Sequence, residues 1–383
     1  MSAAAESPLG LIPAVQTARA GWLRRTGARV LAGARWGAGL FVTIILLAAA
    51  AAVPILNIAV LGYLLEVEGR IARGVPLSDA LPFVRRAPRI GLALALCWAW
   101  LLPVRFIATL AEDAAWISPG TAAQSWTTFL RAALATLVAL HLFAVLARGA
   151  RARDFFRPLA GARWLLSALR GRAELQGLDA LRDAWADVPW RQLFWKGGAG
   201  LLGATAWLAL PVGLLWLSRT GAPKPAAFLP GLLLLLPVLA WLPFVQARFA
   251  VEGNPRAYLD WRAARRLTAA APLSALAALL ALYGLSLPLY LLTIVLPPQD
   301  AMWIATLCFV SALLPGRVAV ALAYRRASRL DRPSHPLLRW TCRALTAALI
   351  LAVAVMLFLA PLIDHRGAAG LFSQHAFALP VPF

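Results

Sequence analysis

The sequence predicts an all-α fold, namely a polytopic transmembrane helical bundle with seven full spans and an N-terminal re-entrant hairpin. The first reason is composition, because 61% of the 383 residues are hydrophobic and only 14% are charged, whereas soluble domains average about 25% charged residues. The second is a series of apolar runs of about 20 residues, the length that crosses a bilayer. The third is the regular alternation of basic and non-basic intervals between these runs.

The N-terminal segment, residues 1–38, is basic. Its five arginines are interleaved with large apolar residues, namely Trp22, Leu23, Val30, Leu31 and Trp36. This mixture is typical of a helix that lies at the membrane interface.

The first apolar segment, Gly39–Leu65, has basic residues on both sides. A single span would place one basic flank outside the cell, and two full spans need about 40 residues. A re-entrant hairpin that breaks near Pro54–Asn57 keeps both flanks on one side, provided that protein surrounds the backbone at the break. The alternative is a bundle of eight spans with an external N-terminus.

Seven further apolar runs follow, and basic residues gather in every second interval. Together, the N-terminal segment and four of these intervals hold 31 of the 37 basic residues, with Arg248 counted in the third interval. Basic loops stay in the cytoplasm, so we expect a cytoplasmic N-terminus and an external tail, 364–383. The runs are 90–110, 125–147, 197–217, 228–248, 272–296, 301–323 and 344–363, and the basic intervals are 66–89, 148–196, 249–271 and 324–343.

The longest basic interval, 148–196, separates two membrane halves, 39–147 and 197–363. Within it, Leu178, Leu181, Trp185 and Val188 recur at helical spacing with acids and Arg182 on the other face. This pattern predicts an amphipathic helix that lies on the membrane or against the bundle and ends at Pro189.

The interval 249–271 contains a second helix signal. Asn254-Pro255 predicts a helix cap followed by proline at the first helical position. Arg256 and Asp260 are then one turn apart, which favours a local ion pair.

The two halves show a weak internal repeat. Trp36-Gly37-Ala38-Gly39-Leu40 and Glu66-Val67-Glu68-Gly69 resemble Lys196-Gly197-Gly198-Ala199-Gly200-Leu201 and Ala250-Val251-Glu252-Gly253. Further parallels join Arg85-Arg86 and Pro88 to Arg265-Arg266 and Pro272, Pro103 to Pro288, and Arg163-Trp164 to Arg339-Trp340. Internal repeats are common in transporter folds. Chance similarity is the alternative, because alanine, glycine and arginine are so frequent in this chain.

One stretch resembles a known family. Pro54-Ile55-Leu56-Asn57, Gly62-Tyr63-Leu64-Leu65, Arg70, Gly74 and Leu81-Pro82 are similar to a motif of uncharacterised bacterial and archaeal multi-pass membrane proteins, a family known only as a domain of unknown function. In that family acidic residues follow the Leu-Pro pair, whereas Phe83-Val84-Arg85-Arg86 follows here. The resemblance implies a helical membrane protein without assigned chemistry.

Motifs for catalysis or metal binding are missing from the sequence. It contains no HExxH, GxSxG or P-loop pattern, and its four histidines and three cysteines are dispersed. We therefore expect no catalytic residue, metal site or cofactor. The net charge of +21 is divided among short loops, so it indicates orientation in a membrane and we expect no nucleic-acid partner.

Two arginines inside apolar runs are the strongest candidates for ligand binding. Arg105 lies near the end of one run and Arg131 near the start of the next. Because consecutive spans are antiparallel, both side chains reach a similar depth and together suit a lipid phosphate or a carboxylate. Glu112 and Asp113 in the joining loop are expected partners. The alternative is that the arginines snorkel outward or pair with these acids.

Asn57 is the fifth candidate, since it lies with Tyr63 beside the proposed hairpin break. Backbone that unwinds at membrane depth must line protein or a cavity, and broken helices form substrate sites in transporters. An ordinary proline kink is the alternative.

Two more ionisable residues in apolar runs are predicted to be structural. His141 has no acid in its span, which favours a hydrogen-bonded packing histidine over a proton relay. Arg317 follows Pro315-Gly316, a predicted kink, and is near enough to the inner surface to snorkel.

We therefore expect a non-enzymatic protein of a bacterial cytoplasmic (inner) membrane that binds or transports a lipid or another anionic or hydrophobic solute. Its expected partners are the lipid bilayer and an anionic lipid. The alternative is a scaffold or assembly factor whose helices around Leu181–Val188 and Arg256–Leu267 dock a cytoplasmic protein. A lipid-modifying enzyme is third, because acids and histidines are scarce inside the spans.

Overall fold

The protein is seen here as a computed structural model, which describes residues 12–170, 188–219, 225–294, 302–330 and 332–359. Every regular element in these ranges is a helix. The all-α polytopic bundle predicted from the sequence is confirmed. The predicted tail, 364–383, and the amphipathic helix through Leu178, Leu181 and Trp185 lie outside the described residues.

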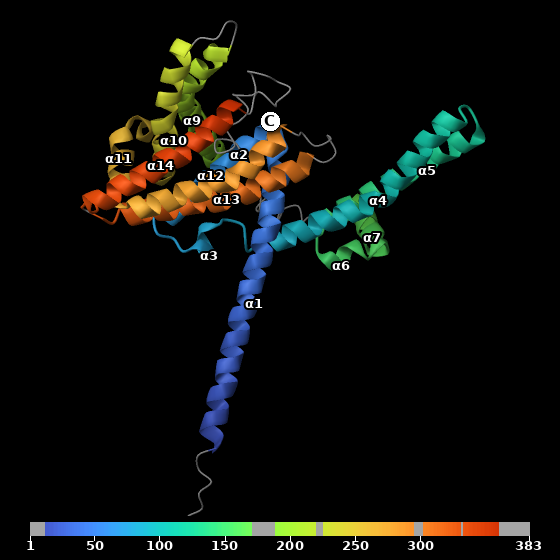
Figure 1. The fold of residues 1–383 in the computed structure, drawn as a ribbon. Helices are drawn as coiled ribbons and strands as arrows, with labels where there is room; N and C mark the ends of the chain where they lie inside the picture. The colour runs from blue at the N-terminus through green and yellow to red at the C-terminus, as the bar shows by residue number, and fades with distance from the viewer. Residues whose placement is uncertain (1–11, 171–187, 220–224, 295–301, 331, 360–383) are drawn as a thin grey trace, which may run out of the picture.

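The chain builds two successive groups of helices (Figure 1). The first group is α1 (Ile12–Ala51), α2 (Pro54–Ala72), α3 (Leu77–Ala80), α4 (Ala87–Ile117), α5 (Ala122–Ala147), α6 (Ala152–Phe155) and α7 (Pro158–Leu169). The second is α9 (Trp190–Arg219), α10 (Pro225–Glu252), η1 (Pro255–Leu259), α11 (Trp261–Ala270), α12 (Pro272–Ile294), α13 (Met302–Ala327) and α14 (Pro336–Leu359).

Eight helices in the described ranges are long and apolar enough to cross a membrane. Seven of them overlap the seven predicted spans, and the eighth is the apolar part of α1, Gly27–Ala51. The chain is therefore a multi-pass membrane protein whose outer helices contact the lipid bilayer. The predicted boundary at residue 38 falls inside α1, so the basic and apolar segments share one helix.

The chain turns at residues 52 and 53 between α1 and α2, close to the predicted break at Pro54–Asn57, and the re-entrant course of this pair stays a prediction. Pro54 begins α2, and Val53 before it is extended, with φ −96° and ψ 120°. A residue that precedes proline is forced out of the helical region, so the break falls slightly earlier than expected. Ala48 and Ala51 of α1 then pack against Val60 of α2.

α2 is the central helix of the bundle. It packs against α1, α9, α10 and α13, and most of its residues are buried. Glycines allow its closest approaches, because a Cβ on Gly62 would lie 1.9 Å from the Leu193 carbonyl oxygen of α9. A Cβ on Gly69 would likewise lie 2.3 Å from the Ala250 oxygen of α10.

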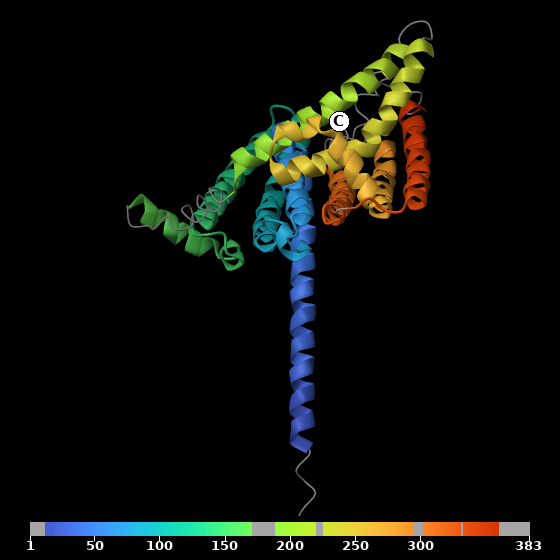
Figure 2. The same cartoon turned by 90° about the vertical axis from the view of Figure 1, so that its left-hand side faces the viewer.

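The helices around this core differ in how far they are enclosed. The N-terminal part of α1 projects as a long rod, and α4 and α5 form an arm that extends away from the body (Figures 1 and 2). By contrast, α12 packs side by side with α13 and α14. His141 joins α5 of this arm to α6, because its Nε2 hydrogen-bonds to the Phe155 carbonyl oxygen at 3.1 Å. The predicted packing histidine is confirmed.

The order of elements agrees with the internal repeat. Each group starts with a helical hairpin, α1–α2 or α9–α10, continues through a short segment, and adds a second hairpin, α4–α5 or α12–α13. Pro103 and Pro288 each stand sixteen residues after the first residue of their helix. These two prolines thus occupy equivalent places in α4 and α12.

Candidate functional site

The structure places the predicted ligand-binding residues in two regions. Arg105 and Glu112 and Asp113 lie on α4, and Arg131 lies on α5, all of them exposed on the arm. Within the described part of the chain, none of the four forms an ion pair within 4.0 Å. Asn57 lies apart from them on α2, where it is buried and its Oδ1 has no hydrogen-bond partner among the described residues.

Tyr63 has a structural role. Its hydroxyl donates a hydrogen bond of 2.6 Å to the Pro82 carbonyl oxygen. The ring also stacks on Phe83, with 6.2 Å between centroids. Tyr63 thereby ties α2 to the segment that leads into α4.

The most deeply buried ion pair among the described residues is one that the sequence did not predict. Glu68 of α2 accepts a hydrogen bond of 2.9 Å from Arg317 of α13, and their side chains are only 1% and 5% exposed. The prediction that Arg317 snorkels to the surface is wrong. An acid on the central helix binds the guanidinium inside the bundle, which compensates part of the cost of removing both charges from water.

A second charged cluster joins the two halves beside this pair. Glu66 of α2 accepts hydrogen bonds from Arg70 and from Lys196 at the start of α9. Arg73 donates to the Ala250 and Val251 carbonyl oxygens near the end of α10, at 3.3 and 3.1 Å. These contacts bring together the end of α2, the start of α9 and the end of α10. We call the side of the bundle on which these ends lie the basic side.

In the segment between α10 and α11, the predicted helix cap is present but the predicted ion pair is not. Asn254 caps the turn as expected, since its side chain accepts a hydrogen bond from the Arg256 N–H. Asp260, however, pairs with Arg248, and the predicted pair with Arg256 is wrong. The reason is that residues 255–259 form a 3₁₀ helix, in which residues four apart do not align as they do in an α-helix.

Asp260 has a second role as the cap of α11. Its side chain accepts a hydrogen bond of 3.0 Å from the Ala263 N–H. The hydrogen bonds from Arg248 and from this N–H hold the pKa of the Asp260 carboxyl below its usual value. The carboxylate is therefore ionised at neutral pH and fixes the start of α11.

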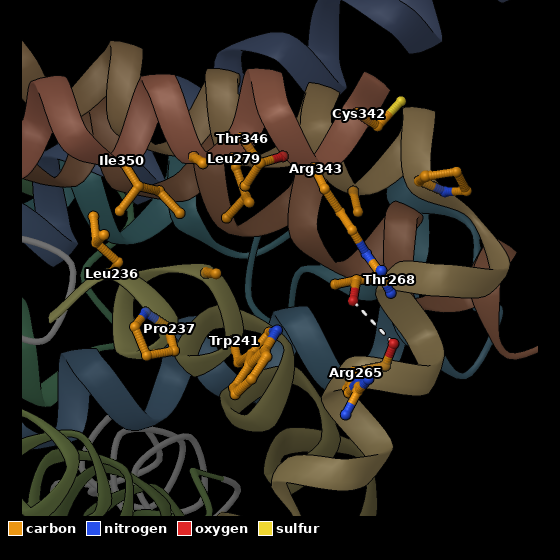
Figure 3. A pocket seen from close by; sticks show the side chains of 14 residues that line it. Leu236, Pro237, Trp241, Arg265, Thr268, Leu279, Cys342, Arg343, Thr346 and Ile350 are labelled. Carbon is orange, nitrogen blue, oxygen red and sulfur yellow. Dashed lines mark hydrogen bonds between the residues drawn. The ribbon is translucent and has the colours of Figure 1, made fainter. Parts of the chain in front are cut away.

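A cavity of about 390 Å³ opens between α10, α11, α12 and α14 (Figure 3). Leu236 and Ile350 lie at one end of it, Arg265 and Arg343 lie at the other, and Leu279 lies between them. Figure 3 shows Arg343 extending from α14 toward α11. The cavity thus changes from apolar to cationic along its length.

The wall of this cavity is reinforced by aromatic contacts. Trp241 lines the cavity and stacks on Trp261 of α11, with 5.8 Å between ring centroids. The Arg262 guanidinium lies over the other tryptophan of this stack, Trp261, at 5.8 Å from its centroid. These contacts hold α11 against α10 beside the opening.

A second cavity, of about 670 Å³, adjoins the first, because Arg265 and Arg343 line both. Among the described residues that line it, Glu252 is the only acid, against six arginines: Arg248, Arg265, Arg266, Arg332, Arg339 and Arg343. Apart from Arg248, none of these has a carboxylate within 4.0 Å in the described ranges. We call the two adjoining cavities the α10–α14 groove.

The groove holds excess positive charge next to an apolar channel, which is the chemistry that binds an anionic amphiphile. No cluster of three His, Cys, Asp or Glu residues able to hold a metal occurs in the described part of the chain. The sequence did carry a signal for the groove. Arg339, Arg343, Ala347 and Ile350 fall on one face of α14, so basic residues lead into apolar ones along the same helix.

Comparison with models of known protein families gives no match, and no similar protein is found among curated sequences or solved structures. The resemblance of residues 54–82 to a family of unknown function remains a prediction.

Proposed function

We propose that this protein binds an anionic phospholipid in the α10–α14 groove, with an acyl chain in the apolar cavity and the phosphate among the arginines. The observation that carries the proposal is that Arg265 and Arg343 line both cavities. One molecule that extends from the first cavity into the second would therefore contact apolar side chains at one end and arginines at the other. A phospholipid has this arrangement, with an apolar tail and an anionic headgroup.

The charges favour a phosphate. A guanidinium donates two parallel hydrogen bonds to phosphate oxygens, and five lining arginines have no carboxylate within 4.0 Å in the described ranges. Position favours a lipid over a soluble anion. The groove lies where the candidate spans Ala226–Glu252, Pro272–Leu289 and Pro336–Leu359 reach the basic side, the level at which headgroups meet a bundle.

We also propose that the basic side faces the cytoplasm of a bacterial cell and that the chain resides in the inner membrane. The support is the distribution of arginine and lysine, because short basic loops are retained in the cytoplasm. The groove would then draw its lipid from the cytoplasmic leaflet.

The arm offers a second candidate site for the same ligand. Arg105 and Arg131 are exposed on adjacent helices that pack against each other, and Glu112 and Asp113 lie nearby in sequence. Asn57 is a separate candidate, supported by its buried oxygen without a described partner. We place the arm second because no described cavity is lined by its arginines.

Native mass spectrometry of the protein released from nanodiscs tests the proposal. The nanodiscs contain phosphatidic acid and phosphatidylcholine with identical acyl chains. Wild-type protein should retain phosphatidic acid preferentially, and R265Q/R343Q should lose at least about tenfold in apparent affinity. A charge-assisted hydrogen bond contributes about 1.5–3 kcal/mol, and about 1.4 kcal/mol corresponds to a factor of ten.

The matched control is R105Q/R131Q, which removes the same charge from the arm. Retention should be unchanged in this variant if the groove holds the lipid. If the control loses phosphatidic acid while R265Q/R343Q keeps it, the site belongs to the arm. If both variants retain the lipid as the wild type does, the proposal for either arginine pair is wrong.

A further inference from the structure

A separate cavity of about 840 Å³ lies in the first half, between α1 and the segment that leads into α4. Arg35, Arg85 and Arg89 are its charged lining residues, and no acid lines it within the part of the chain that the structure describes. Arg85 is held from outside the cavity by Asp79, at 2.8 Å. Arg35 and Arg89 have no carboxylate within 4.0 Å in the described part of the chain.

A buried donor without a described partner belongs to one of the residues that line this cavity. Trp36 lines it, and the indole N–H of Trp36 is shielded from solvent without a hydrogen-bond partner among the described residues. A shielded N–H without an acceptor is costly. An anion seated between the arginines would supply oxygen atoms that accept from their guanidinium groups.

The hollow exists because α1 presents small residues there. Ala32, Gly33 and Ala38 form part of its wall, and a Cβ built on Gly33 meets no atom within 4 Å. These residues stand just before the apolar run that begins at Gly39, and Pro88 and Arg89 stand at the start of the candidate span Ala87–Ile117. Both walls therefore lie at span ends, where lipid headgroups are found.

The position of this cavity matches that of the groove in the other half. Arg85 and Pro88 line it, and their counterparts in the internal repeat, Arg265 and Pro272, line the α10–α14 groove. Both cavities thus adjoin the start of the third long helix of their half. The opposite wall differs, because α1 supplies it in the first half and α14 in the second.

We propose that the α1–α4 cavity, defined by Arg35, Trp36, Arg85 and Arg89, is a second phospholipid headgroup site. It shares no residue with the α10–α14 groove, so either site can fail without the other. The protein then holds two anionic lipids, one in each half. Charge complementarity and the position at two span ends select an anionic lipid as the occupant.

Counting retained phosphatidic acid molecules by native mass spectrometry tests this second site. Wild-type protein should retain two, and G33W should retain one, because the indole fills the cavity from a position where a side chain meets open space. R35Q/R89Q should also retain one, which keeps the test decisive if G33W fails to fold. The matched control is G27W, six residues earlier on α1, where a Cβ also meets no atom within 4 Å.

The outcomes separate the two sites. Loss of one lipid in R265Q/R343Q and of both in its combination with R35Q/R89Q supports two sites. If G33W and R35Q/R89Q keep the wild-type number, the second site is wrong and the groove is unaffected. If the wild type retains only one lipid, and inorganic phosphate binds to the wild type but not to R35Q/R89Q, the cavity is a site for soluble anions and the lipid assignment is wrong.

Discussion

The Glu68–Arg317 pair shows how a single contact overturns a prediction from sequence, because Arg317 was expected to snorkel to the surface and instead binds an acid inside the bundle. Removing two charges from water costs several kcal/mol per ion, so each residue is tolerated at this depth only because the other is present. Glu68 belongs to an interval counted as a loop in the sequence, and Arg317 stands near a span end. Nothing in their spacing, 249 residues apart, indicates that they meet.

Removing one partner of this pair should be more damaging than removing both. E68Q leaves the Arg317 guanidinium buried opposite a neutral amide, and a broken buried pair costs about 3–5 kcal/mol. We expect the midpoint of thermal unfolding in mild detergent to fall by several degrees in E68Q. Loss of intrinsic fluorescence or of the monodisperse elution peak on heating measures it.

The double variant E68M/R317M should recover most of this loss, because apolar side chains of similar length often replace a buried ion pair at little cost. R317M alone should behave like E68Q. If the double variant unfolds as if the two single losses were added, the pair does not contribute as a unit.

The residues of the candidate site were only partly accessible from sequence. The arginines of the α10–α14 groove were recognised as basic and assigned to orientation, which is how most such residues act. Their convergence depends on α11 and α14 both packing against α10, so that Arg265 and Arg343, 78 residues apart, line the same cavity. Composition and periodicity do not contain that information.

At the scale of elements, the junction between the halves depends on glycine. α2 and α9 meet at Gly62 and Gly197, and a Cβ on Gly197 would lie 1.8 Å from the Ile58 carbonyl oxygen. Backbone atoms cannot rotate away as a side chain can, so any larger residue forces the helices apart. Small residues serve the same purpose at many membrane helix interfaces.

G62A should therefore lower the free energy of unfolding by about 3 kcal/mol, the upper part of the range for overpacked cores. The matched control is G198A, on the same helix as Gly197, where a Cβ meets no atom within 4 Å. Stability there should stay the same or rise by up to about 1 kcal/mol, because alanine favours helix more than glycine does. Equal thermal midpoints for G62A and wild type would show that α2 and α9 are less tightly joined than the structure indicates.

At the scale of the whole molecule, the sequence predicted the spans well and their packing hardly at all. Span positions follow from local hydrophobicity, and all seven predicted runs overlap helices that can cross a membrane. The central place of α2 was not predictable in this way. Its second half carries Glu66, Glu68 and Arg70, and these charges predicted a loop. In the structure Glu68 is buried, and Glu66 and Arg70 are partly buried.

The position of α2 bears on the orientation of the N-terminus. Because α1 and α2 form a hairpin, the start of α1 and the end of α2 point the same way, and the end of α2 is joined to the basic ends of α9, α10 and α13. We therefore expect the N-terminal segment on the basic side. With an external N-terminus, α2 would have to continue away from α1 and could not run antiparallel beside it.

A reporter enzyme that is active only outside the cytoplasm measures this orientation. Fused near Arg24 or at Asn254 it should be inactive, and fused in the turn between α4 and α5, near Gly120, it should be active. The expected pattern follows from the hairpin, since an even number of crossings separates Arg24 from the end of α2. Strong activity near Arg24, with the other two fusions as expected, would mean that α1 crosses alone and that α2 does not return to the side from which α1 begins.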